Sequence, residues 1–115
     1  MRITAGRLRG RKITVPGTPG VRPTPSKVRQ ALFNILGSVD EADMLDLFSG
    51  SGLMAVEALS RGAASVVSIE KERRIVGSLA AMRADFELDD AWQLICGDAQ
   101  KELVKLKDRH FDVVF

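Results

Sequence analysis

The fold is decided by residues 44–70, MLDLFSGSGLMAVEALSRGAASVVSIE, which hold a strand, a glycine turn, a helix and a second strand in succession. The apolar run 44–48 predicts a buried strand. Residues 53–61 predict a helix that Gly62 ends, and residues 65–69 predict the second strand. A strand, a crossover helix and another strand form a right-handed parallel unit, so the segment predicts a parallel sheet.

The same rhythm continues towards the carboxyl end of the chain. The remaining predicted elements are a helix with Ile75, Leu79, Met82 and Phe86 on one face, a strand at 92–96, a short helix at 99–107 and a strand at 111–115. Apolar strands that alternate with helices need cover on both faces, which argues for a doubly wound α/β fold. No helix follows the last strand, so we expect an open edge and the amino-terminal part of a longer protein, with a natively short protein as the alternative.

The amino-terminal segment has a different character. Residues 2–5 and 11–15 are β-like stretches around a Gly- and Arg-rich turn, which predicts a hairpin. All four prolines fall within 16–25 and predict an irregular loop. We therefore expect two parts, a basic hairpin and Pro-rich loop over 1–25 and a Rossmann-like domain over 26–115.

A helix is predicted directly after the Pro-rich loop. Thr24 is its expected N-cap, with Pro25 at the first helical position. Its apolar face, up to a stop at Gly37, is predicted to consist of Val28, Ala31, Leu32 and Ile35.

The composition predicts one globular domain. The chain has 115 residues, of which 45% are hydrophobic and 28% are charged. No apolar run approaches the ~20 residues of a membrane span, and the amino terminus lacks the apolar stretch of a secretory signal. The single Cys cannot form an internal disulfide, so we expect a cytoplasmic protein.

Charge is segregated along the chain. Residues 1–39 hold eight basic side chains and no Asp or Glu, whereas the other 76 residues hold nine basic and fifteen acidic ones. A basic arm on an acidic body is typical of a protein with a polyanionic partner, because each Lys or Arg near a phosphate releases a counterion. Nucleic acid is the leading partner, and a solvated basic surface without a ligand is the alternative. The basic residues are Arg2, Arg7, Arg9, Arg11, Lys12, Arg22, Lys27 and Arg29.

A glycine-rich turn, DLFSGSG at 46–52, joins the first strand to its helix. Glycines at alternating positions let the backbone approach a ligand, and the helix that follows presents N–H groups. Ala55 stands where the dinucleotide fingerprint has its third Gly, a replacement that the fingerprint tolerates. The turn predicts a nucleotide site, with a purely structural turn as the alternative.

Acidic residues mark three successive predicted strands. Glu70 closes the second strand, where a carboxylate can accept hydrogen bonds from both hydroxyls of a ribose. Asp98 follows the third strand and could accept a bond from an adenine amine or simply cap the next helix. Asp46 lies within an apolar strand, where a carboxylate needs partners.

These residues resemble motifs of a known family. The stretches DLFSGSGL at 46–53, EALSRGA at 57–63 and IEK at 69–71 look like motifs I and II of class I S-adenosylmethionine-dependent methyltransferases. The stretch RPTPSKVRQALFNIL at 22–36 is similar to the signature that precedes motif I in the RsmD-like 16S rRNA guanine-N2 methyltransferases. The resemblance covers essentially the whole chain.

The resemblance implies the Rossmann-like class I methyltransferase fold and S-adenosyl-L-methionine as cofactor. Its methionine end would meet Thr24, Asp46, Ser49, Gly50 and Gly52. Glu70, with Lys71 beside it, would hold the ribose, and Asp98 with Ala99 would meet the adenine. RNA would be bound by Arg7, Arg9, Arg11, Lys12, Arg22, Lys27 and Arg29.

The reaction implied is methyl transfer to the exocyclic N2 of one guanine, in 16S rRNA or a small-subunit assembly particle. The family's Asp/Asn-Pro-Pro-Tyr/Phe motif is absent from these 115 residues, so we expect the chain alone to be inactive and to carry no catalytic residue. Its open sheet edge predicts self-association. His110 and Cys96 receive no catalytic role, no metal site is expected, and Trp92 is interpreted as a core residue.

Two other functions stay open at this stage. A nicotinamide-dependent Rossmann oxidoreductase has no use for the basic arm and would carry Gly where this turn has Phe48. A non-catalytic RNA-binding or ribosome-assembly module would keep the fold without turnover. Cofactor preference separates the oxidoreductase from the methyltransferase.

Overall fold

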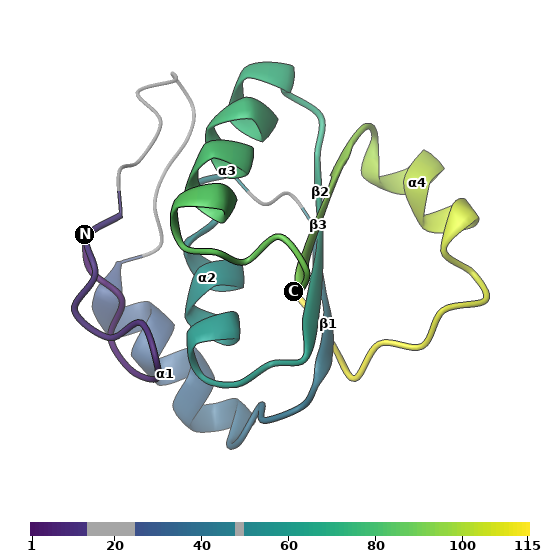
Figure 1. Ribbon diagram of the computed structural model, residues 1–115. Helices are drawn as coiled ribbons and strands as arrows, with labels where there is room; N and C mark the ends of the chain where they lie inside the picture. Colours follow the sequence, from purple (N-terminus) through teal and green to yellow (C-terminus); the bar gives the residue numbers. More distant parts are fainter. Residues whose placement is uncertain (14–24, 48–49) are drawn as a thin grey trace.

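The structure, a computed structural model, describes residues 1–13, 25–47 and 50–115. Figure 1 shows one sheet with α1, α2, α3 and the amino terminus on one face and α4 on the other. The strands are all parallel and lie in the order β3-β2-β1-β4, which confirms the predicted α/β fold. The elements are α1 (Ser26–Leu36), β1 (Asp43–Leu47), α2 (Leu53–Ser60), β2 (Ser65–Glu70), α3 (Arg73–Asp85), β3 (Trp92–Cys96), α4 (Ala99–Lys105) and β4 (Val113–Val114).

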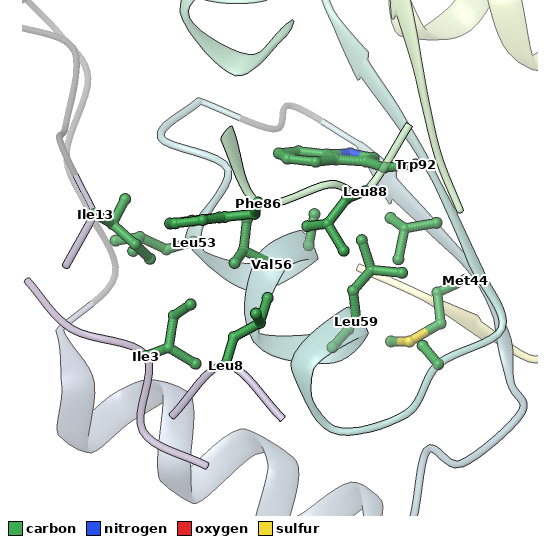
Figure 2. Close-up of a cluster of buried hydrophobic side chains, with 14 of the residues drawn as sticks. Ile3, Leu8, Ile13, Met44, Leu53, Val56, Leu59, Phe86, Leu88 and Trp92 are labelled. Carbon is green, nitrogen blue, oxygen red and sulfur yellow. The ribbon is translucent and has the colours of Figure 1, made fainter. Parts of the chain in front are cut away.

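The sheet is buried on both faces because successive strand residues point to opposite sides. Met44 and Val66 belong to the larger cluster under α2 and α3, whereas Leu45 and Val67 belong to the smaller cluster on the side of α4. Figure 2 shows the larger cluster, in which Trp92 lies among side chains from the helices and the strands. In the order β3-β2-β1-β4, β1 and β2 are the two central strands. The described helices include none that is long and apolar enough to cross a membrane.

The amino-terminal segment packs onto the same core. The predicted hairpin forms, but as a single antiparallel bridge between Arg2 and Lys12 rather than as two strands, and the expected strand residues 14 and 15 lie outside the described part. Ile3, Leu8 and Ile13 are buried in the cluster that also holds α2 (Figure 2). Helix α2 is thereby covered on both sides, which explains why seven of its eight residues are buried.

Two predictions about helix α1, its N-terminal cap and its buried face, are wrong. Pro25 is itself the N-cap, so the expectation that it occupies the first helical position is wrong, and Thr24 lies outside the described residues. The buried face consists of Arg29 and Phe33, not of the predicted apolar set. Phe33 packs edge-on against Phe115, with ring centroids 6.1 Å apart. Because residues 29 and 33 face the body of the protein, the predicted apolar residues are exposed, namely Val28, Ala31, Leu32 and Ile35.

Strand β4 is shorter than predicted. Only Val113 and Val114 pair with β1, and Val114 is exposed. The start of β4 is tethered to β1 because the Asp43 N–H donates to the Asp112 carboxylate at 2.8 Å. That hydrogen bond, together with His110, lowers the pKa of Asp112. Within the described residues no strand covers the outer side of β4, so this edge of the sheet is open.

Candidate cofactor site

The carboxyl ends of β1, β2 and β3 share one edge of the sheet, because the strands are parallel. Leu47 lies opposite Ile69, and Glu70 lies opposite Cys96. The glycine turn after β1 and the segment after β3 therefore come to the same edge, as the sequence predicts. Ligands of doubly wound sheets bind outside this edge, near the strand where the chain order reverses. Here that strand is β1, which is followed by the glycine turn.

The turn needs glycine for two physical reasons. Gly50 and Gly52 have φ values of +55° and +75°, which side-chain-bearing residues rarely adopt. A Cβ on Gly52 would also lie 2.6 Å from Cδ2 of Leu79 and 3.1 Å from Cη2 of Trp92. The backbone at Gly52 thus lies directly against the core, and α2 begins immediately after it.

Replacing Gly52 with Ala is therefore expected to lower the free energy of unfolding by about 1–3 kcal/mol, through left-handed strain and overpacking. Gly77→Ala is the matched control, because a Cβ on this helical glycine meets no atom within 4 Å. It should stabilise the protein by about 0.5–1 kcal/mol. Urea unfolding of both variants measures the difference. Equal stabilities would contradict the described packing of the turn.

Glu70 links the three segments at this edge. Its Oε1 accepts a hydrogen bond from the Gly50 N–H at 3.2 Å, and its Oε2 accepts one from the Glu72 N–H at 2.8 Å. The Glu70 backbone carbonyl accepts from the Gly97 N–H at 3.0 Å. Each carboxylate oxygen has a second lone pair, so the side chain can accept further bonds from a ligand.

Asp46 has buried polar partners that the sequence analysis did not identify. The Ser68 hydroxyl donates to Asp46 Oδ2 at 3.1 Å, and the indole N–H of Trp92 donates to Ser68 Oγ at 2.9 Å. All three residues are buried, and the interpretation of Trp92 as a core residue is confirmed. The signal that could have revealed Ser68 is a hydroxyl residue in an otherwise apolar strand.

Asp98 caps α4, which is one of the two roles that the sequence allows for this residue. Its side chain accepts a hydrogen bond from the Gln100 N–H at 3.2 Å and caps α4. Ala99 is buried in the smaller core cluster, whereas Lys71 is exposed. A contact of Asp98 and Ala99 with adenine stays a prediction. Ser49 lies outside the described residues.

The predicted RNA-binding residues differ in their exposure. Arg29 is 0% exposed, so the prediction that it contacts RNA is wrong. Arg11 stacks on the ring of Phe86 at 4.5 Å and approaches Asp85 at 3.9 Å, yet remains about half exposed. Arg22 lies outside the described part of the chain. The exposed basic residues of this set are Arg7, Arg9, Arg11, Lys12 and Lys27.

The buried Arg29 forms an ion pair with Glu57 of α2. Its carboxylate lies 3.4 Å from Arg29 Nε and 3.2 Å from Arg61 Nε. The same carboxylate accepts hydrogen bonds from the backbone N–H groups of Thr4 and Ala5 at 3.0 and 3.2 Å. This buried cluster, here called the Glu57 cluster, joins the amino terminus, α1 and α2. No role was predicted for Glu57 from the sequence.

The sheet order and the glycine turn together define the structural class of this protein. The order 3-2-1-4 is that of the Rossmann-like nucleotide-binding sheets. A solved Escherichia coli structure described as a candidate methyltransferase matches 90% of this chain and 55% of its own, with 36% identity and a TM-score of 0.81. A hypothetical protein from Thermus thermophilus matches 100% of this chain and 67% of its own, with 30% identity and a TM-score of 0.86. The chain thus has the Rossmann-like methyltransferase fold.

The family described as Conserved hypothetical protein 95 matches residues 1–115. This chain belongs to that family, the RsmD-like methyltransferases. Ribosomal RNA small subunit methyltransferase D of Escherichia coli K12 is 46% identical over 89 residues, which are 73% of this chain and 45% of the relative. The Haemophilus influenzae protein of the same name is 33% identical over 118 residues, 100% of this chain and 61% of the relative. The chain therefore spans about half the length of these relatives.

Proposed function

We propose that this chain is the cofactor-binding part of an S-adenosylmethionine-dependent rRNA methyltransferase that acts in the cytoplasm. The observation that carries the proposal is the position of Glu70. Its carboxylate lies at the end of β2 and is held by the N–H of Gly50, beside a turn whose backbone has no side chain at Gly50 or Gly52. A fixed carboxylate next to such a turn suits a nucleoside whose ribose carries two hydroxyl groups. The relatives named above support rRNA as the substrate.

The finer assignment is methylation of the exocyclic N2 of a guanine in 16S rRNA, free or in an assembling small subunit. S-Adenosylmethionine supplies the methyl group on its sulfonium. The residues of this chain would hold the cofactor, with Glu70 at the ribose, the segment of Asp98 and Ala99 at the adenine, and Asp46, Gly50 and Gly52 at the methionine end. This arrangement would fix the methyl group for transfer to a positioned nitrogen.

Calorimetric titration of S-adenosylmethionine and NAD into the 115-residue chain tests the proposed cofactor. We expect saturable binding of S-adenosylmethionine and no binding of NAD. A preference for NAD would favour the oxidoreductase that the sequence alone left open. Binding of neither ligand would contradict the assignment of the site.

The chain alone is expected to be inactive, and methyl incorporation into 16S rRNA by this chain would contradict that prediction. Light scattering tests its predicted self-association.

RNA binding is expected to depend on the exposed arginines of the amino-terminal hairpin. Replacing both Arg7 and Arg9 with Ala should weaken binding to RNA of any sequence and reduce the slope of log K against log salt by about 2, because two phosphate contacts are lost. Filter binding at several salt concentrations measures this slope. The control is the double replacement of Lys101 and Lys107, exposed residues in and beside α4 on the opposite face of the sheet (Figure 1). An equal loss in both variants would mean that binding follows net charge and not the hairpin.

A further inference from the structure

A chain of buried hydrogen bonds crosses β3, β2 and β1 below the glycine turn. It runs from the indole N–H of Trp92 to Ser68 Oγ and from the Ser68 hydroxyl to Asp46 Oδ2, over 2.9 and 3.1 Å. Trp92 and Ser68 are each 1% exposed. Polar groups at such depth are costly unless they are satisfied, so the arrangement is tightly determined.

The chemistry of the three groups sets the direction of this chain. An indole N–H can only donate, so Ser68 Oγ must accept from Trp92. The hydroxyl of Ser68 has one proton, which is then directed to Asp46. The chain thus delivers a donor to the carboxylate and holds Oδ2 in one orientation.

The same indole also supports the turn. A Cβ on Gly52 would lie 3.1 Å from Cη2 of Trp92, so the far edge of the ring is in close contact with the turn backbone. One side chain therefore both carries the glycine turn and begins the chain that orients Asp46. A change at Trp92 would disturb both parts of the site together.

A second Ser–Asp pair on the same two strands provides a comparison. Ser65 donates to Asp43 Oδ1 at 2.7 Å, and this pair occupies the same cross-strand register as Ser68 and Asp46, three residues earlier. It lies at the amino edge of the sheet, away from the glycine turn, and it is only half-buried. The Ser65–Asp43 hydrogen bond thus only links two strands. The Ser68–Asp46 pair differs because Ser68 also accepts a hydrogen bond from the Trp92 indole, which contacts the turn at Gly52.

We propose that Ser68 and Trp92 are positioning residues that hold the Asp46 carboxylate for the ammonium group at the methionine end of S-adenosylmethionine. The inference rests on the proposed function. It assigns selectivity for the amino-acid part of the cofactor to two core residues that need not touch the ligand. A carboxylate held by a neighbouring donor keeps its orientation when the cationic group arrives, so less order has to be created on binding.

The test compares two ligands. S-Adenosylhomocysteine carries the amino-acid group, whereas 5′-methylthioadenosine has the adenosine and sulfur without it. Ser68→Ala should weaken S-adenosylhomocysteine binding by up to about tenfold, the upper end of the cost of ordering one side chain on binding. Binding of 5′-methylthioadenosine should change by less than about twofold, as expected for an independent site. Ser65→Ala, the matched control, should leave the affinity for both ligands unchanged.

Trp92→Phe removes the indole donor together with the ring edge that lies against Gly52. Because Asp46 and Gly52 are both placed at the methionine end, this variant should also weaken binding of S-adenosylhomocysteine more than binding of 5′-methylthioadenosine. This variant carries the test if Ser68→Ala does not fold. Urea unfolding followed by circular dichroism reports whether Ser68→Ala is folded, because the fluorescence of Trp92, the only Trp in the sequence, also responds to the loss of its own hydrogen-bond partner.

Each outcome of this comparison either supports or overturns the inference. A selective loss for S-adenosylhomocysteine supports the inference. An equal loss for both ligands, no loss, or the same loss in Ser65→Ala overturns the inference and leaves the proposed function standing. A wild-type chain that binds neither ligand overturns the proposed function and the inference with it.

Discussion

Replacing Glu57 with Gln is expected to lower the free energy of unfolding by about 3–5 kcal/mol, because the change leaves a buried guanidinium without its carboxylate. Glu57 is 1% exposed, and its partner Arg29 is 0% exposed. The amide of Gln keeps the shape of the side chain, so no cavity forms. The loss measures the missing charge together with an amide NH2 group that now faces donors which the carboxylate accepted. Urea unfolding followed by circular dichroism measures the effect.

Two variants make the Glu57 prediction specific. Asp85→Asn removes the acidic partner of an exposed pair, Arg11 with Asp85 at 3.9 Å, and should change stability by less than about 1 kcal/mol. Adding Arg29→Met to Glu57→Gln removes the guanidinium that pairs with Glu57, so the double variant should be more stable than the sum of the single effects predicts. A loss below about 1 kcal/mol for Glu57→Gln would contradict a buried ionic cluster.

Replacing Glu70 with Ala is expected to weaken S-adenosylmethionine binding by about a hundredfold, because two hydrogen bonds from the ribose to a charged acceptor are lost. The side chain also holds the N–H groups of Gly50 and Glu72, at 3.2 and 2.8 Å. The loss of affinity in Glu70→Ala therefore has two causes: the ribose contact is removed, and the turn loses a support. Calorimetry of the purified variant measures the affinity.

A ligand lacking one hydroxyl separates these two contributions. The wild-type chain should bind 2′-deoxy S-adenosylhomocysteine more weakly than S-adenosylhomocysteine, and Glu70→Ala should have lost this discrimination. Glu72→Ala is the control, because this side chain is exposed and makes no cap hydrogen bond to α3. If Glu70→Ala still discriminated between the ligands, Glu70 would support the turn without contacting the ribose.

Periodicity predicted a parallel sheet and the succession of strands and helices along the chain. Strand β2 was placed to within one residue, and α3 was predicted on its buried residues Ile75 and Leu79. The positions of Gly50, Gly52 and Glu70 at one edge also followed from the sequence, because parallel strands bring their carboxyl ends together. These predictions depend on local patterns and on the handedness of crossovers, which neighbouring residues encode.

Helix α1 shows where such reasoning fails. Its apolar spacing indicated one face, yet Arg29 is buried and Ile35 is 82% exposed. A basic residue in a basic segment is expected at the surface, and nothing near it in the chain marks it as buried. Its partner Glu57 is 28 residues away, so the pair exists only once α1 and α2 have packed together.

The sequence by itself determined the family, the parallel sheet and the residues at its carboxyl edge, because motifs and strand periods are local properties. Only the tertiary structure decided which polar groups are buried and what satisfies them. The Glu57 cluster joins segments that are far apart in the chain, and the path from Trp92 through Ser68 to Asp46 joins three strands. A buried charge or hydroxyl is stable only with partners at hydrogen-bond distance, and those distances are set when the segments pack, not by their order in the chain.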